Sequence, residues 1–245
     1  MTTHDDTLVL IPGLMCDHAV WTPVLPALRQ TPDVRLGTVH IADHGTTAGS
    51  LAAMADQILQ AVPGPLAVAG HSMGGRVALE IWRQAPQRVR RLALLDTGCG
   101  VRPAGAAGEA ERDKRMALLA LARREGVRAM ATQWVQGMVH PARLGDRALV
   151  DAILDMFERR SADVFALQLQ ALLDRPEAGD VLASVDVPLC IGCGAQDSWA
   201  PVAQHEAMVA LNPRARLEVI ADAGHMAPME RPEATAAVLA RWLQA

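Results

Sequence analysis

The sequence predicts an α/β fold in which helices cover a parallel sheet. Short apolar runs of strand length alternate with stretches of helical periodicity in the first and last parts of the chain. This alternation is typical of right-handed βαβ units. The middle of the chain shows helical periodicity only, which indicates an all-helical insertion. The 245 residues are within the range of one α/β domain.

The first half of the predicted core occupies residues 1–97. Apolar runs predict its strands, at 7–11, 34–41, 66–69 and 91–95. Apolar residues at helical spacing predict its helices, at 19–28, at 51–62 and after residue 72 until Pro86 ends the pattern.

Residues 98–180 are predicted to form a helical cap inserted after the fourth strand. Residues 101–115 are rich in Gly, Ala, Arg and Glu, and we interpret them as a linker. Helices are expected at 116–124, 130–138, 149–157 and 164–173, the last with Ser161 in position to cap it. We expect this block to lie over the edge of the sheet and to gate access to it.

The second half of the core, 181–245, repeats the alternation. Strands are predicted at 187–193 and 217–220, and a helix at 202–211 lies between them. The closing helix, 232–243, begins with Pro232, and proline is favoured at a first helical position.

Composition excludes several function classes. Hydrophobic residues make up 51% of the chain, charged residues 20%, and the net charge is −4 without a block of Lys or Arg. We therefore expect no nucleic-acid or membrane partner. The polar start and the lack of a long apolar run indicate a cytoplasmic protein. Cys190 and Cys193 lie inside a predicted strand without a second ligand pair, so we expect buried thiols and no metal site.

One stretch carries a chemical motif. Gly70-His71-Ser72-Met73-Gly74 fits G-x-S-x-G, with a strand pattern before it and a helix pattern after it. On such a strand-to-helix turn the serine has a strained backbone that exposes its hydroxyl. Small residues two before and two after the serine let the strand and the helix pack closely. The context predicts Ser72 as a nucleophile rather than a residue of an inert turn.

This chain resembles the alpha/beta-hydrolase family from about residue 8 to residue 243. The likeness rests on four stretches: PGLMCDHAVW at 12–21, GHSMGG at 70–75, GAQDSWAP at 194–201 and AGHMAPMERPEA at 223–234. It implies a core of about six parallel strands, because an opening antiparallel hairpin is missing. It also implies a capped serine esterase that needs no cofactor.

The resemblance assigns roles to single residues. The family order of nucleophile, acid and histidine is met by Ser72, Asp197 and His225. Asp96, at the end of the fourth strand, is the alternative acid. The oxyanion hole would use the backbone N–H groups of Leu14 and Met73. Side chains near these positions are candidates for substrate binding: Met15, His18, Trp134, Met138, Trp199 and Met226.

The predicted reaction is hydrolysis of a small or medium neutral carboxylic ester through an acyl-enzyme on Ser72. The short stretches expected over Ser72 contain no Lys or Arg, and a buried carboxylate would need one. Arginines of the cap could still reach the site: Arg102, Arg143, Arg159 and Arg160. A lactonase, a thioesterase, a carbon–carbon bond hydrolase and a non-catalytic receptor for a small ligand stay as alternatives. The sequence does not predict the oligomeric state.

Overall fold

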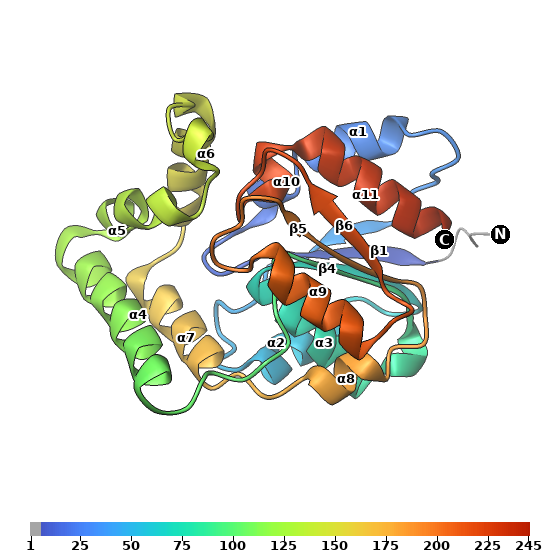
Figure 1. Ribbon diagram of the computed structural model, residues 1–245, viewed down its shortest axis with the longest axis horizontal. Coiled ribbons are helices and arrows are strands. Elements are labelled where there is room, and N and C mark those ends of the chain that lie inside the picture. Colours follow the sequence, from blue (N-terminus) through green and yellow to red (C-terminus); the bar gives the residue numbers. More distant parts are fainter. Residues whose placement is uncertain (1–5) are drawn as a thin grey trace.

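The computed structural model describes residues 6–245 and contains one six-stranded sheet. The strand order is β2-β1-β3-β4-β5-β6, and each neighbouring pair is parallel (Figure 1). The strands are β1 (Thr7–Ile11), β2 (Val39–Ile41), β3 (Leu66–His71), β4 (Val89–Leu95), β5 (Leu189–Gly194) and β6 (Arg216–Ile220). The prediction of a parallel six-stranded core is confirmed.

Helices cover both faces of this sheet. One face carries α1 (Val24–Gln30) and α11 (Pro232–Gln244), which pack against each other. The other face carries α2 (Leu51–Ala61), α3 (Met73–Gln84), α8 (Gly179–Ala183) and α9 (Val202–Leu211). The central strands β3 and β5 are buried along their whole length, as expected for strands covered on both faces.

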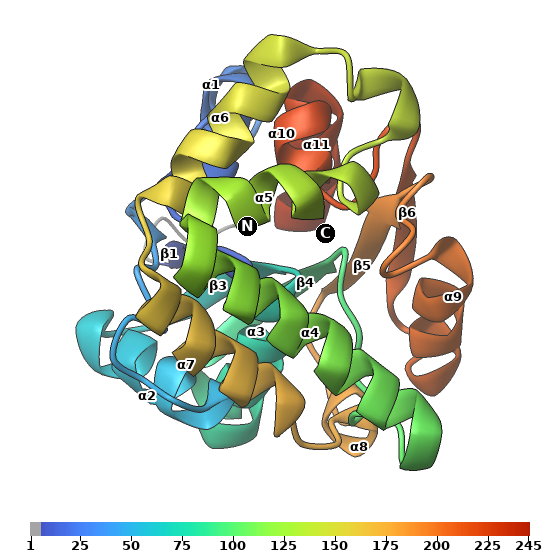
Figure 2. The same ribbon diagram turned by 90° about the vertical axis from the view of Figure 1, so that its left-hand side faces the viewer.

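Four longer helices connect β4 to β5 and lie to one side of the sheet (Figures 1 and 2). They are α4 (Gly105–Glu125), α5 (Val127–Trp134), α6 (Arg147–Glu158) and α7 (Ala162–Leu173). Short 3₁₀ turns occur at His18–Val20, Pro86–Arg88, Val135–Gly137 and Pro141–Arg143, and the short helix α10 (Ala227–Glu230) precedes α11. Ser161 caps α7 as expected, with its Oγ accepting from the N–H of Val164.

The linker predicted at 101–115 is wrong over most of its length. Helix α4 is continuous over 21 residues and begins at Gly105. Alanine, glutamate and arginine are good helix formers, and two glycines near the start do not outweigh them. Glu111 and Arg115 form an i,i+4 ion pair of 2.9 Å, and Arg175 adds a tertiary ion pair to Glu111.

Strand β2 is shorter than the predicted strand 34–41. Its residues pair only with β1, from Leu8 opposite Val39 to Leu10 opposite Ile41. Within the described part of the chain, β1 begins at Thr7 and pairs with β2 from residue 39 onward. The predicted helix 19–28 is likewise divided, because Pro23 separates the 3₁₀ turn from α1.

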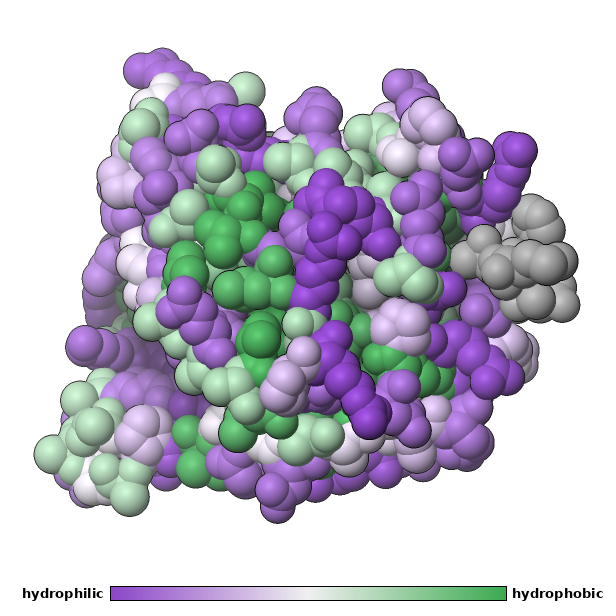
Figure 3. Space-filling model, turned by 45° about the vertical axis from the view of Figure 1, so that its right-hand side comes forward, coloured by the Kyte–Doolittle hydropathy of each residue, from purple (hydrophilic) through white to green (hydrophobic). Residues whose placement is uncertain are grey.

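On the face shown in Figure 3, hydrophobic residues form small patches separated by hydrophilic ones. Among residues 6–245, no helix has both the length and the apolar character required to span a membrane.

Candidate active site

Ser72 occupies the turn between β3 and α3. Its backbone angles are φ 54° and ψ −117°, a strained conformation for a residue other than glycine. The turn depends on two glycines. A Cβ at Gly70 would overlap the carbonyl of Gly74, and a Cβ at Gly74 would overlap the carbonyl of Ile11. The strand therefore approaches the helix closely enough to project the hydroxyl of Ser72 beyond the carboxyl edge of the sheet.

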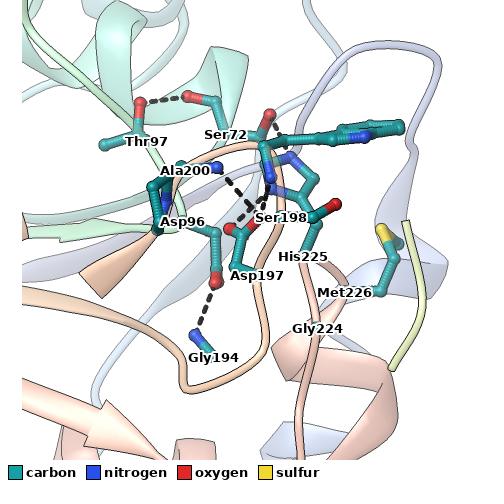
Figure 4. Close-up of polar contacts among 12 residues, drawn as sticks. Ser72, Asp96, Thr97, Gly194, Asp197, Ser198, Ala200, Gly224, His225 and Met226 are labelled. Atoms are coloured by element: carbon teal, nitrogen blue, oxygen red, sulfur yellow. Dashed lines mark hydrogen bonds and ion pairs between the residues drawn. The ribbon is translucent and has the colours of Figure 1, made fainter. Parts of the chain in front are cut away.

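A chain of hydrogen bonds joins Ser72 to His225 and His225 to Asp197 (Figure 4). The Oγ of Ser72 lies 2.8 Å from Nε2 of His225. Nδ1 of His225 lies 2.8 Å from Oδ2 of Asp197. The three residues follow β3, β5 and β6, whose carboxyl ends lie at the same edge of the sheet. The structure thus brings together the three residues that the sequence predicted.

The environment of Asp197 keeps it ionised. Burial alone would raise its pKa, but His225 and the N–H groups of Ala200 and Trp199 hold the pKa of Asp197 below the usual value. These two N–H groups donate to Oδ1 at 3.0 and 2.8 Å. The carboxylate is therefore held in place as well as ionised.

Asp96, the alternative acid, has a different role in the structure. Its Oδ1 accepts from the N–H of Gly194 at 2.8 Å, and the side chain is fully buried. Burial and the negative charge of Asp197 raise the pKa of Asp96 well above the usual value. The carboxylate that is hydrogen-bonded to the ring of His225 is that of Asp197, not that of Asp96.

The two residues expected to form the oxyanion hole both line the cavity beside Ser72. Met73 is the first residue of α3, where a backbone N–H has no carbonyl partner inside the helix. Leu14 follows Gly13, and a Cβ at Gly13 would lie 3.1 Å from Cβ of Ser72. The loop after β1 therefore runs close to the serine.

The cavity has a volume of about 130 Å³ and is lined by both apolar and polar side chains. Of the six residues predicted to bind substrate, four line it: Trp134, Met138, Trp199 and Met226. The ring of Trp134 stacks on Trp199 at a centroid distance of 5.3 Å. Trp199 in turn lies 4.9 Å from the ring of His225. An aromatic wall thus extends from α5 to the histidine.

The other two predicted binding residues, Met15 and His18, are placed elsewhere. Met15 is fully buried in the hydrophobic core, and its backbone has a φ of 62°. The side chain of His18 is 67% exposed, and its Nδ1 lies 3.7 Å from Oδ1 of Asp17. The 3₁₀ turn at 18–20 directs the histidine to the surface, so nearness in sequence to the loop after β1 was a misleading signal.

Several residues that position the site were missed in the sequence. Gln168 of α7 is buried and accepts the N–H of Met15 at 2.8 Å, which fixes the loop after β1. Glu230 of α10 is buried and accepts the N–H groups of Gly224 and Met226, on either side of His225. The contact of Gln168 joins residues far apart in the chain, and that of Glu230 depends on a single side chain. No local sequence motif predicts either of them.

Two arginines line the cavity, Arg76 of α3 and Arg115 of α4. The short stretches that the sequence placed over Ser72 contain neither. The four arginines named as candidates are absent from the lining and bind other groups. Arg102 and Arg143 donate to backbone carbonyls, and Arg159 and Arg160 donate to Asp17 and Asp43.

Among the residues that the structure describes, no group of three or more His, Cys, Asp or Glu side chains is arranged to hold a metal ion. Cys16, Cys99, Cys190 and Cys193 are all buried free thiols. Burial raises the pKa of Cys190 and of Cys193 to about 12, so neither is a reactive thiolate at neutral pH.

Comparison with known proteins places this geometry in a family. Over 244 residues the chain is 30% identical to a pimeloyl-[acyl-carrier protein] methyl ester esterase of Nitrosomonas europaea, covering 95% of this chain and 93% of the relative. A protein of the same name from Aromatoleum aromaticum is 31% identical over 259 residues, covering 95% and 96%.

Solved structures share the fold. An enol-lactonase of Burkholderia xenovorans superposes with a TM-score of 0.83 at 20% identity, covering 98% of this chain and 92% of the other. A thermophilic esterase of Thermogutta terrifontis gives a TM-score of 0.81 at 24% identity, covering 98% and 89%. The sequence profile described as the alpha/beta hydrolase family matches residues 8–238. The chain therefore belongs to the alpha/beta hydrolase family.

Proposed function

We propose that this protein is a serine hydrolase that cleaves carboxylic esters. The observation that carries the proposal is the hydrogen-bonded chain of Ser72, His225 and Asp197 beside a cavity at the carboxyl edge of the sheet. The relatives named as methyl ester esterases, which match nearly the whole chain, support the same reaction class.

In the proposed mechanism, the Oγ of Ser72 attacks the ester carbonyl while Nε2 of His225 takes its proton. Asp197 accepts the Nδ1–H of His225, which fixes the tautomer and stabilises the imidazolium that forms. The backbone N–H groups of Leu14 and Met73 donate to the developing oxyanion. His225 then protonates the leaving alcohol, and an acyl-enzyme forms on Ser72. Water activated by His225 releases the acid and restores the serine.

The size of the cavity supports a small or medium substrate. The volume is about 130 Å³. The neutral character that the sequence favoured is not part of this proposal, because two guanidinium groups line the cavity. A cytoplasmic location stays a prediction, supported by the free thiols of all four cysteines.

We further propose that helices α4 to α7 act as a cap between core halves 1–97 and 181–245, within the predicted segment 98–180. Trp134 and Phe157 of these helices line the cavity. Two ion pairs fasten the turn between α6 and α7 to the core: Arg159 to Asp17 and Arg160 to Asp43, each at 2.6 Å. Substrate entry then requires a rearrangement of these helices.

The test is hydrolysis of p-nitrophenyl esters by the wild type and by Ser72→Ala. Because a triad acts as a unit, kcat should fall by up to about a million-fold. Ser198→Ala is the matched control, since Ser198 is exposed and close to Asp197 in the chain; it should keep nearly full activity. A fluorophosphonate probe should label the wild type and Ser198→Ala but not Ser72→Ala. Failure of the wild type to react with the probe or to turn over any ester would favour the non-catalytic receptor.

A further inference from the structure

Arg76 is a cationic side chain in the cavity without an anionic partner. It lies on α3 four residues after Ser72, about one helical turn and about 6 Å along the axis. Its Nη1 donates to the carbonyl of Gly100 at 2.8 Å. Within residues 6–245, no carboxylate lies within ion-pair distance of its guanidinium, although thirteen ion pairs join other arginines to carboxylates.

The surroundings of Arg76 make the cavity positive. Arg115 also lines it, while Glu111 is shared between Arg115 at 2.9 Å and Arg175 at 2.7 Å. Asp96 is the acidic residue of the lining, and burial together with the negative charge of Asp197 raises its pKa well above the usual value, which favours the uncharged form. Burial and the positive charge of Arg175 lower the pKa of Arg76 to about 10, which leaves it charged at neutral pH.

The hydrogen bond that Arg76 makes within the protein leaves most of its N–H donors free. A guanidinium has five N–H donors, and one of them is accounted for by Gly100. The neighbouring Arg115 differs, because its Nε and Nη2 both point to Glu111. Among residues 6–245, the buried polar atoms that lack a partner include none from Arg76, so its remaining donors are not sealed away from solvent. The residue itself lines the cavity.

We propose that Arg76 is the carboxylate-binding residue of the substrate cavity, so that the preferred ester bears a carboxylate a few bonds from the scissile carbonyl. The inference rests on the proposed ester hydrolysis and names its substrate class. A single guanidinium fork matches a carboxylate, which can accept two parallel N–H bonds. The second charge of a phosphate would call for further donors. Binding the carboxylate compensates the buried charge of Arg76, and the apolar wall holds the rest of the substrate.

The experiment compares matched esters that differ by one carboxylate. On the acyl side, mono-p-nitrophenyl adipate is compared with p-nitrophenyl hexanoate. On the alcohol side, 4-carboxyphenyl butyrate is compared with phenyl butyrate. The proteins are the wild type, Arg76→Gln, Arg76→Lys and, as a matched control, Arg90→Gln, which removes an exposed arginine of β4. Circular dichroism and fluorophosphonate labelling of Ser72 report that each variant is folded.

We expect the wild type to prefer the carboxylated ester in one of the two pairs by at least about tenfold in kcat/KM. Arg76→Gln should lose about 10- to 100-fold on that ester, mainly through KM, the range of a charged hydrogen bond. The loss on the matched neutral ester should be clearly smaller than the loss on the carboxylated one. Arg76→Lys should recover part of the loss, and Arg90→Gln should match the wild type. The pair that responds identifies whether the acyl or the alcohol part carries the carboxylate.

A binding measurement makes the result independent of turnover. Adipate should quench tryptophan fluorescence through Trp134 and Trp199, and its Kd should rise at least about tenfold in Arg76→Gln. The inference is overturned if the wild type has the higher kcat/KM for the neutral ester in both pairs. It is also overturned if Arg76→Gln lowers kcat/KM equally for both members of a pair, or if adipate has the same Kd for the wild type and Arg76→Gln. Normal turnover of neutral esters with no carboxylate preference would overturn the inference alone, whereas loss of all ester turnover by the wild type would contradict the proposed function.

Discussion

Two buried carboxyl groups, Asp197 and Asp96, lie near each other in this protein, and their pKa values are shifted in opposite directions. The pKa of Asp197 is held below the usual value by His225 and by two backbone N–H groups, which outweigh the effect of burial. Burial and the negative charge of Asp197 raise the pKa of Asp96. Two adjacent buried carboxylates repel each other, so ionisation of Asp197 disfavours ionisation of Asp96. Asp197 is also the carboxylate that is hydrogen-bonded to His225.

This difference predicts unequal effects of two similar substitutions. Asp197→Asn should lower kcat about a thousandfold or more, because an amide cannot hold His225 in the required tautomer. Asp96→Asn should change kcat by less than about threefold, since its Oδ1 can still accept from the N–H of Gly194. Steady-state kinetics on one p-nitrophenyl ester measures both. A larger loss for Asp96→Asn would assign the acid to the end of β4.

Stability gives a second readout at the same residue. The pKa of Asp96 is higher in the folded state than its usual value of 3.8, so the unfolded chain releases this proton first as the pH rises. Asp96 therefore lowers the free energy of unfolding above about pH 4. Asp96→Asn should unfold at the same temperature or a higher one near neutral pH.

At the scale of elements, helix α7 holds the loop after β1, which contains Leu14 of the expected oxyanion hole. Gln168 accepts the N–H of Met15 at 2.8 Å and donates to the carbonyl of Gly45 at 3.3 Å. The two loops follow β1 and β2, which are neighbouring strands of the sheet. One side chain of α7 thus connects two loops at the carboxyl ends of the strands, and one of these loops carries Leu14.

Replacing Gln168 with leucine should therefore affect catalysis at a distance. The N–H of Met15 would be left buried without an acceptor, at a cost of about 1–3 kcal/mol in unfolding free energy. The loop with Leu14 would shift, and we expect kcat to fall about 10- to 100-fold with a smaller change in KM. Kinetics on a small ester and thermal unfolding measure the two effects.

Two variants make this prediction specific. Gln168→Glu keeps the acceptor for Met15 but loses the donor to Gly45, so its kcat should lie between those of the wild type and the leucine variant. Gln170→Leu alters the same helix on a side chain that donates to Asp174 at the surface, and it should leave kcat unchanged. Equal kcat in all four proteins would remove Gln168 from the set of positioning residues.

For the whole molecule, buried neutral histidines predict loss of stability in acid. Burial lowers the pKa of His44 to about 4 and that of His71 to about 3, against a usual value of 6.5, and also lowers the pKa of His205. The unfolded chain therefore binds more protons below about pH 6.5. The free energy of unfolding should decrease from there to about pH 4, by at most about 1.4 kcal/mol per pH unit for each histidine.

Thermal unfolding between pH 8 and pH 4 checks this expectation. His44→Gln should flatten the decrease, because the residue no longer takes up a proton on unfolding. His18→Gln is the control, since His18 is 67% exposed in the folded protein. Carboxylates with lowered pKa values, such as Asp17 and Glu111, add to the loss only below about pH 4.5. A melting temperature that stays constant from pH 6.5 to 4.5 would contradict the prediction that buried neutral histidines destabilise the protein in acid.

Local sequence patterns determined most of the core. Apolar runs and helical periodicity predicted six strands in parallel, and the G-x-S-x-G turn with its flanking elements predicted the position of Ser72. These signals are local because each strand, helix and tight turn depends on neighbouring residues. The order Ser72, Asp197, His225 came from resemblance, and the structure places these three side chains in hydrogen-bond contact.

Tertiary structure alone decided which other side chains reach the cavity. Arg76 and Arg115 enter it from α3 and α4, whereas Met15 turns into the core and His18 faces the surface. The direction of a side chain depends on contacts with residues distant in the chain. The residues next to Arg76 in the sequence do not indicate that it lines a cavity. That cavity is formed by helices that come together only in the folded protein.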